Sequence, residues 1–189
     1  MDLIGTPWLI LLAYWAISAF RVKQTQRAEP AGSRLVVLAI VIVAFTILFG
    51  PWLKNSPLGN RFLPDSPWIR YLGIFLLWVG IGFAIWARHH LGEYWSARVT
   101  IKVDHKLIDS GPYAYVRHPI YSGILLGLIG TALAIGKWRA VVAFLVILIV
   151  YVFKARREEG MLTEQLGEPY REYKNHTGML IPRWKTASP

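Results

Sequence analysis

The densest run of residues that could do chemistry lies at Gly111–Tyr121, which holds Arg117, His118 and three tyrosines. Gly111 and Pro112 interrupt regular structure at its start. Pro119 suits the first turn of a helix, where the missing N–H of proline costs nothing. The N-terminus of a helix favours anionic groups such as a carboxylate. The run therefore predicts a polar binding site where a helix begins, although its tyrosines and arginine, taken singly, also fit a membrane interface.

A second cluster of charged residues lies at Lys154–Glu159. Lys154 and Glu158 are four residues apart and share one face of a helix. The alternative interpretation is an exposed helix end, whose ion pairs contribute only about 0.3–0.5 kcal/mol each.

In a third stretch, His89, His90 and Glu93 lie close together, but their spacing is not that of a zinc-binding helix. No metal site is therefore expected.

Long apolar segments must position these clusters. The chain has 189 residues, of which 54% are hydrophobic and 17% charged, and its apolar blocks approach the length that crosses about 30 Å of hydrocarbon. We expect an all-α integral membrane protein, because a helix satisfies its own backbone hydrogen bonds in lipid. Five spans are predicted, the last two as a helical hairpin: Leu3–Phe20, Leu35–Leu53, Trp68–Ala87, Ile120–Ile135 and Trp138–Phe153.

The positions of lysine and arginine predict the orientation. With the N-terminus outside, most of the 21 basic residues fall in the cytoplasmic segments, as the positive-inside rule requires. The external segments hold only Lys54, Arg61, Arg70, Lys137 and Arg139. The C-terminus and both charged clusters are then cytoplasmic. We expect one membrane domain, 1–189, made of three N-terminal spans (1–87) and a catalytic half (88–189).

Composition excludes several classes of protein. The net charge of +10 is explained by basic residues that flank the spans and meet anionic lipid, without the basic–aromatic pattern of a nucleic-acid module. The absence of cysteine excludes disulfides and thiolate catalysis. Asp2, with no basic residues before the first apolar run, indicates a retained span and not a cleaved signal peptide. Walker loops, GxGxxG motifs and serine nucleophile elbows do not occur in the sequence.

Taken together, the motifs resemble the isoprenylcysteine carboxyl methyltransferase family over about Trp86–Pro182. The resemblance is carried by the stretches His90-Leu91-Gly92, Trp95-Ser96, His105-Lys106-Leu107-Ile108, Arg117-His118-Pro119-Ile120-Tyr121, Glu158-Glu159 and Leu166-Gly167-Glu168-Pro169-Tyr170 followed by Tyr173. Related membrane phospholipid N-methyltransferases and some membrane sterol reductases carry similar C-terminal patterns.

The resemblance implies S-adenosylmethionine as the methyl donor and S-adenosylhomocysteine as the product. It implies a cofactor pocket formed by Arg98, His105, Lys106, Leu107, Ile108, Tyr113, His118, Pro119, Ile120, Tyr121 and Glu158. The family usually has an arginine four residues before this glutamate, to orient a substrate carboxylate. Here that residue is Lys154, which cannot grip a carboxylate with two parallel bonds. Lys154 and Glu158 are the expected catalytic residues.

The expected reaction is methyl transfer to a lipophilic acceptor, a lipid or a lipidated molecule, at the cytoplasmic face. A carboxylate acceptor is slightly favoured. An amine acceptor, as in phospholipid N-methylation, is the alternative, and Glu158 or Glu159 would then accept the proton. An NADPH-dependent membrane reductase and a non-enzymatic membrane protein remain as rival hypotheses. A transporter would more often place an ionisable group in mid-span.

Overall fold

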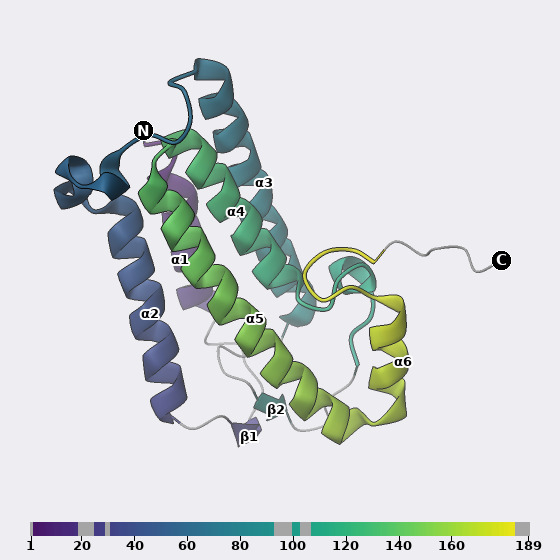
Figure 1. Ribbon diagram of the computed structural model, residues 1–189. Helices are drawn as coiled ribbons and strands as arrows, with labels where there is room; N and C mark the ends of the chain where they lie inside the picture. Colours follow the sequence, from purple (N-terminus) through teal and green to yellow (C-terminus); the bar gives the residue numbers. More distant parts are fainter. Residues whose placement is uncertain (1, 19–24, 29–30, 93–99, 103–106, 184–189) are drawn as a thin grey trace.

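The structure is a computed structural model that describes residues 2–18, 25–28, 31–92, 100–102 and 107–183. Its helices form an elongated bundle, with a shorter helix beside one end (Figure 1). The α-helices are α1 (Gly5–Ser18), α2 (Ala31–Phe49), α3 (Pro67–Leu91), α4 (Pro119–Ile135), α5 (Trp138–Leu166) and α6 (Glu168–His176). Short 3₁₀ helices are η1 (Pro51–Asn55), η2 (Pro57–Gly59) and η4 (Gly111–Ala114).

Each of the five predicted spans overlaps a helix, although most of their boundaries differ. The second span was expected to reach Leu53, but α2 ends at Phe49 because Pro51 lacks the N–H that a continuing helix needs. The fifth was expected to end at Phe153, but α5 continues to Leu166 as a polar extension. By length and composition, α3 and α5 could cross a membrane, and α1, α4 and residues 35–49 of α2 are shorter apolar helices.

The structure also contains a small sheet, which the expectation of an all-α chain did not include. Strand β1 (Thr25–Ala28) pairs in antiparallel fashion with β2 (Thr100–Lys102). Both segments lie between apolar helices and lack their period, and β2 contains Thr100 and Ile101, which are β-branched and favour extended backbone. The pairing joins the connection before α2 to the connection after α3.

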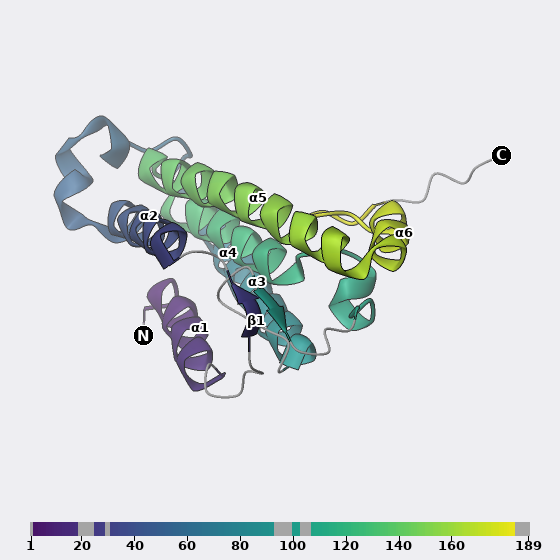
Figure 2. The same ribbon diagram turned by 90° about the horizontal axis from the view of Figure 1, so that it is seen from below.

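Helix α4 lies between α3 and α5 (Figures 1 and 2), and glycines let it approach α3 closely. A Cβ atom added to Gly80 would come within 3.0 Å of the backbone of Gly123 and Gly127, and one added to Gly73 would meet the backbone of Gly130 in the same way. Such contact between helix backbones is typical of small residues in membrane helices. Gly123 and Gly127 are four residues apart in the fourth predicted span, a small-xxx-small spacing that predicts close approach of a neighbouring helix. The structure confirms Gly123, whereas a side chain at Gly127 would meet mainly other side chains.

The predicted hairpin of the last two spans is confirmed. Gly136 ends α4 in the left-handed conformation, with φ of 65°, and its N–H donates to the carbonyl of Ala132 at 2.8 Å, which is a common way to end a helix. At its far end α5 turns through Gly167, also at positive φ, into α6, which runs back beside it (Figure 1). The hairpin and this return bring the start of α4, the polar end of α5 and α6 together.

Candidate functional site

The residues before α4 are held in place by the C-terminal segment. The backbone N–H of Arg117 donates to the carbonyl of Gly178 at 2.8 Å, and that of His118 donates to the carbonyl of Met179 at 3.1 Å. The hydroxyl of Ser122, in the first turn of α4, donates to the carbonyl of Leu180 at 2.6 Å. The start of α4 is thus paired with a segment distant in the sequence, and His118 is its N-cap residue.

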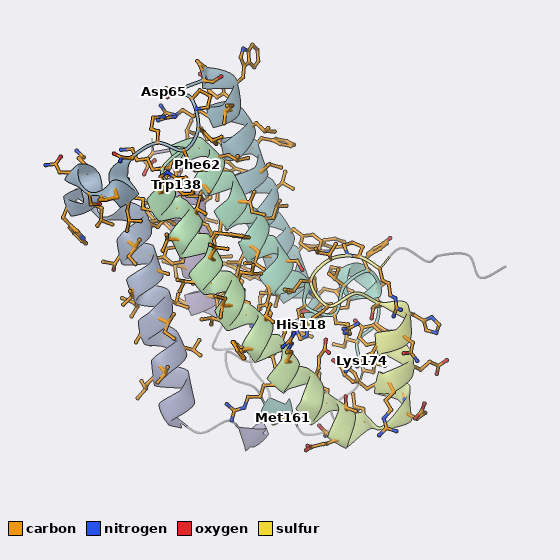
Figure 3. The ribbon with its side chains drawn as sticks, viewed as in Figure 1. Phe62, Asp65, His118, Trp138, Met161 and Lys174 are labelled. Atoms are coloured by element: carbon orange, nitrogen blue, oxygen red, sulfur yellow. The ribbon has the colours of Figure 1, made fainter. Side chains whose placement is uncertain are left out.

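Two adjacent carboxylates of α5 face this start of α4. Glu158 accepts a hydrogen bond from the Tyr121 hydroxyl at 2.7 Å and lies 3.4 Å from Nδ1 of His118. Glu159 lies 3.3 Å from Nε2 of the same ring, 2.7 Å from Nε of Arg117 and 3.3 Å from Nζ of Lys174. Both ring nitrogens of His118 therefore face a carboxylate oxygen, and His118 and Lys174 lie at the same end of the bundle (Figure 3).

This arrangement favours the doubly protonated form of His118. Burial alone would lower the pKa of His118, but its hydrogen bonds to Glu158 and Glu159 and their negative charges outweigh burial and raise it above 6.5. Burial by itself would raise the pKa of Glu159, but hydrogen bonds from His118 and Arg117 and their charges lower it to about 2. The contacts therefore favour an imidazolium between two carboxylates.

Aromatic rings line the other side of His118. The His118 and Tyr121 rings stack with centroids 5.4 Å apart, and the Tyr121 and Tyr151 rings stack at 4.5 Å. Nζ of Lys154 lies 5.4 Å from the centroid of the Tyr121 ring, within the range of a cation–π contact. One tyrosine thus contacts the histidine, the lysine and, through its hydroxyl, Glu158.

The turn η4 is fixed between α3 and α6. The Tyr173 hydroxyl of α6 donates to the carbonyl of Tyr113 at 2.6 Å, and the Tyr113 ring stacks on His90 at the end of α3, 6.3 Å away. His90 Nε2 also lies 3.0 Å from the Ser110 hydroxyl. At Gly111, with φ of 58°, a side chain would collide with the His90 ring, so this position requires glycine. Burial raises the pKa of Tyr113 far above its ordinary value, which keeps its phenol neutral.

Comparison with known proteins places this arrangement in a family. The family model described as phospholipid methyltransferase matches residues 68–169, more than half of the chain. The chain belongs to the phospholipid methyltransferase family. The matched region contains α3, α4, α5 and both charged clusters, and the resemblance indicated by the sequence motifs is confirmed.

Curated relatives in this family differ in the acceptor that their names specify. The chain is 29% identical to a methanethiol S-methyltransferase of a Pseudomonas species, over 84% of this chain and 60% of the relative. It is 35% identical to a protein-S-isoprenylcysteine O-methyltransferase of Saccharomyces cerevisiae, over 59% of this chain and 48% of the relative. A probable protein-S-isoprenylcysteine O-methyltransferase of Oryza sativa is 31% identical over 62% of this chain and 64% of the relative. The chain thus spans less than two thirds of the length of each.

The structure brings together the four residues of the expected site with the strongest polar chemistry: His118, Tyr121, Lys154 and Glu158. Pro119 and Ile120 are buried at the start of α4, and Ile120 belongs to the apolar core. Ile108 packs against that core, and Leu107 beside it is half-buried. Tyr113 lies in η4. The remaining expected positions, Arg98, His105 and Lys106, lie outside the described residues.

Three further residues complete the network around His118: Arg117, Glu159 and Lys174. The sequence contained a signal for Arg117 and Glu159, since Arg117 adjoins His118 and Glu159 adjoins Glu158, both expected site residues. Nothing in the sequence indicated that Lys174 belongs to the site, because its position near Glu159 depends on the return of α6 along α5. The arginine nearest to Lys154 in α5 is Arg156. It is exposed, whereas Lys154 is half-buried, so the two lie on different faces of α5.

Proposed function

We propose that this protein is an integral membrane methyltransferase that uses S-adenosylmethionine to methylate a lipophilic acceptor at the cytoplasmic face. One observation carries the proposal. At the point where the apolar part of α5 gives way to its polar extension, Lys154 lies over the Tyr121 ring, and Tyr121 and His118 both contact Glu158. Membership of the family and the methyltransferase names of the relatives support this reaction class.

In this proposal α1 to α5 cross the bilayer as a single membrane domain, with the N-terminus outside. Large apolar side chains of these helices are exposed to the surroundings, among them Leu9, Leu35, Phe75 and Ile149. Such exposure is unfavourable in water and expected in lipid. The side chains of Asp65 and Trp138 lie at the end of the bundle opposite His118 and Lys174 (Figure 3), so the charged clusters share one face.

The side chains present suit a cofactor that has a cationic sulfonium and a zwitterionic amino-acid group. S-adenosylmethionine supplies an activated methyl group on a sulfonium, and it carries an ammonium and a carboxylate. The Tyr121 ring already has a cation, that of Lys154, over its face, and a sulfonium would be stabilised by the same quadrupole. A carboxylate such as Glu158 has room for further donors beyond Tyr121 and His118. The N-terminus of α4 suits the cofactor carboxylate.

For the acceptor, we propose a carboxylate on a lipophilic or lipidated molecule. The network holds Arg117, His118, Lys154 and Lys174 against two carboxylates, an excess of positive charge that favours an anionic guest. Burial by itself would raise the pKa of Glu158, but its hydrogen bond with His118 and the charge of Lys154 lower it. A low pKa makes this carboxylate a weak base, which argues against an amine acceptor that must lose a proton.

Orientation and exclusion of water would supply most of the rate, because methyl transfer is an in-line displacement. His118 and Tyr121 would hold Glu158, Glu158 would hold the cofactor, and Lys154 would hold the acceptor carboxylate as a point charge. A carboxylate nucleophile needs no base. The acceptor would enter from the bilayer and the cofactor from the cytoplasm.

The test is transfer of label from S-adenosylmethionine with a radioactive methyl group into membranes that contain the protein. Label that base releases as volatile methanol would identify an ester and support the proposal. Label that stays in extracted lipid after base would show an amine or thiol acceptor. Membranes with His118→Ala serve as control, since this variant should bind S-adenosylhomocysteine at least about tenfold more weakly. If purified protein binds no S-adenosylhomocysteine, the proposed activity is wrong; oxidation of NADPH would then favour a reductase.

A further inference from the structure

Glu159 is 6% exposed, yet three basic side chains from two other parts of the chain converge on it. Arg117 and His118 come from the start of α4, and Lys174 comes from α6. A buried carboxylate is retained at low cost only where cations and hydrogen bonds compensate its charge. We propose that Glu159 is a positioning residue, which links the C-terminal segment to His118 and holds the His118 ring against Glu158.

Arg117 provides the link to the C-terminal segment. Its Nε donates to Glu159 at 2.7 Å. Its Nη1 donates to the carbonyl of Lys174 at 3.2 Å and also to the carbonyl of Thr177. These carbonyls belong to the last turn of α6 and the residue after it, where a helix leaves carbonyls unpaired and favours a cation. One guanidinium therefore joins α5 to the end of α6.

Directly beyond α6, the chain pairs with the backbone that precedes α4. Val116 and Gly178 form a parallel bridge, and the carbonyls of Gly178 and Met179 accept the N–H groups of Arg117 and His118. His118 is thus fixed through its backbone by the C-terminal segment and through its ring by α5. Both attachments depend on the same Arg117–Glu159 pair, because this pair sets where α6 ends relative to α4.

The neighbouring carboxylates of Glu158 and Glu159 have different contacts and different proposed roles. Glu158 faces Tyr121 and, in the proposed function, the cofactor. Glu159 Oε1 faces Nε2 of His118, and Oε2 faces Lys174, so its contacts point toward α6 and the C-terminal segment. Since both ring nitrogens of His118 need a carboxylate to stay in place, the loss of Glu159 would free the ring to turn away from Glu158. Glu159 acts through His118, without touching the reacting groups.

If Glu159 were only a structural anchor, it would hold α6 in place without affecting the charge of His118. A positioning residue would also raise the pKa of the His118 ring, so titration of the ring distinguishes the two roles. Among the described residues, the titratable groups that contact His118 are Glu158 and Glu159 of α5 and Tyr121 of α4. Arg117 and Lys174 act on it through Glu159, and Lys154 lies across the Tyr121 ring. Neutralising Glu159 removes one of two carboxylates and should lower the pKa of His118 toward 6.5.

The experiment follows His118 by NMR in purified full-length protein with labelled histidine, its signal identified by its loss in His118→Asn. In Glu159→Gln we expect the His118 pKa to fall and the affinity for S-adenosylhomocysteine to drop at least tenfold; Glu159→Asp should restore part of both. The control is Glu172→Gln, which removes one negative charge from an exposed position of α6 and should change neither. An unchanged His118 titration in folded Glu159→Gln would overturn the proposal.

If Glu159→Gln does not fold, Lys174→Met provides a second test with the opposite sign. The Lys174 side chain is 37% exposed, and its removal leaves the contacts of Glu159 with Arg117 and His118 in place. With one cation fewer on Glu159, its charge acts more strongly on the ring, and the His118 pKa should rise. A titration unchanged there would also overturn the proposal. Cofactor binding rests on the proposed function, but the titration does not: wild-type protein that binds no S-adenosylhomocysteine would refute that function and leave the titration to decide the role of Glu159.

Discussion

The Tyr121 hydroxyl of α4 donates a hydrogen bond of 2.7 Å to Glu158 of α5. This bond crosses between the two helices of the hairpin at the end where their apolar parts finish. It also fixes the Tyr121 ring between the rings of His118 and Tyr151, which stack against it. The tyrosine therefore orients both the carboxylate and the aromatic surface that we propose for the cofactor.

Replacement of Tyr121 by phenylalanine isolates the contribution of this hydroxyl. Tyr121→Phe keeps the ring stacks, so the fold should be retained, but Glu158 loses a donor. A hydrogen bond to a charged group contributes about 1.5–3 kcal/mol, so S-adenosylhomocysteine should bind at least tenfold more weakly by calorimetry. Tyr115→Phe is the control, because Tyr115 is exposed. Equal affinity in Tyr121→Phe and wild type would show that the hydroxyl does not orient the site.

The His118–Glu159 interaction should give the protein a defined pH range of greatest stability. The folded pKa of Glu159 is about 2, below its ordinary value of 4.5, so its contribution is present above pH 4.5 and is lost as the pH falls toward 2. The folded pKa of His118 lies above 6.5, so its contribution is full below pH 6.5 and is lost as the pH rises through the folded value. Both contributions are present between these limits.

Thermal unfolding in detergent, measured against pH, checks this expectation. The stability advantage of wild type over His118→Asn should be greatest at about pH 5–6 and should shrink toward alkaline pH. His176→Asn, which changes an exposed histidine of α6, should follow the wild-type curve. An advantage that grows with rising pH would show that His118 is neutral in the folded protein.

Membrane orientation can be tested with single cysteines, because the chain contains none. Asp65→Cys lies in the loop before α3, where the side chain is 84% exposed, and Glu172→Cys lies on α6. If the positive-inside assignment is right, a membrane-impermeant thiol reagent should label only the first in intact cells and both after permeabilisation. If only Glu172→Cys is labelled in intact cells, the orientation is the opposite one, and the site faces away from the cytoplasm, where the cofactor is available.

Composition and the lengths of the apolar segments were enough to predict α1 to α5 and the hairpin of α4 and α5, although not their bounds. These features depend on local sequence: α4 ends and the hairpin turns at Gly136, because glycine adopts positive φ there without strain. The meeting of His118 with Glu158 was also predictable in outline, since both motifs lie at the same end of neighbouring helices.

The rest of the site depends on contacts between distant parts of the chain. Nothing local indicates that Gly178 and Met179 pair with the backbone before α4, or that Lys174 reaches Glu159. Both follow from the turn at Gly167, which returns α6 along α5. The glycine contact between α3 and α4 was only partly predicted. The spacing of Gly123 and Gly127 indicated it, but the backbone contact extends along α4 to Gly130, which faces Gly73 of α3.

The α3–α4 contact should tolerate almost no added volume. Gly80→Ala places a Cβ against the backbone of α4, and overpacking of this kind costs about 1–3 kcal/mol. Gly82→Ala is a matched control on the same helix, since an added Cβ there meets nothing within 4 Å and alanine is the better helix former. In detergent, Gly80→Ala should lower the unfolding temperature, and Gly82→Ala should keep or raise it. Equal temperatures would show that the helices are not in backbone contact.

The identity of the acceptor turns on Lys154, which lies over the Tyr121 ring on the face of α5 that carries Glu158. If the acceptor is a carboxylate, Lys154→Ala should lose about 2–4 kcal/mol of transition-state stabilisation, as for other oriented donors. Lys154→Arg should keep or improve the rate, because a guanidinium grips a carboxylate with two bonds and also stacks on aromatic rings. If the acceptor is an amine, Lys154→Ala should be mild.

The measurement is the initial rate of methyl transfer at saturating S-adenosylmethionine, so that a change in cofactor affinity does not enter the comparison. Arg156→Ala is the matched control, because Arg156 lies two residues away on an exposed face of the same helix and should leave the rate unchanged. Glu158→Gln is not decisive alone, since Glu158 would also hold the cofactor. A near-normal rate in Lys154→Ala, together with a severe loss and a shifted pH profile in Glu158→Gln, would reject the carboxylate and favour an amine.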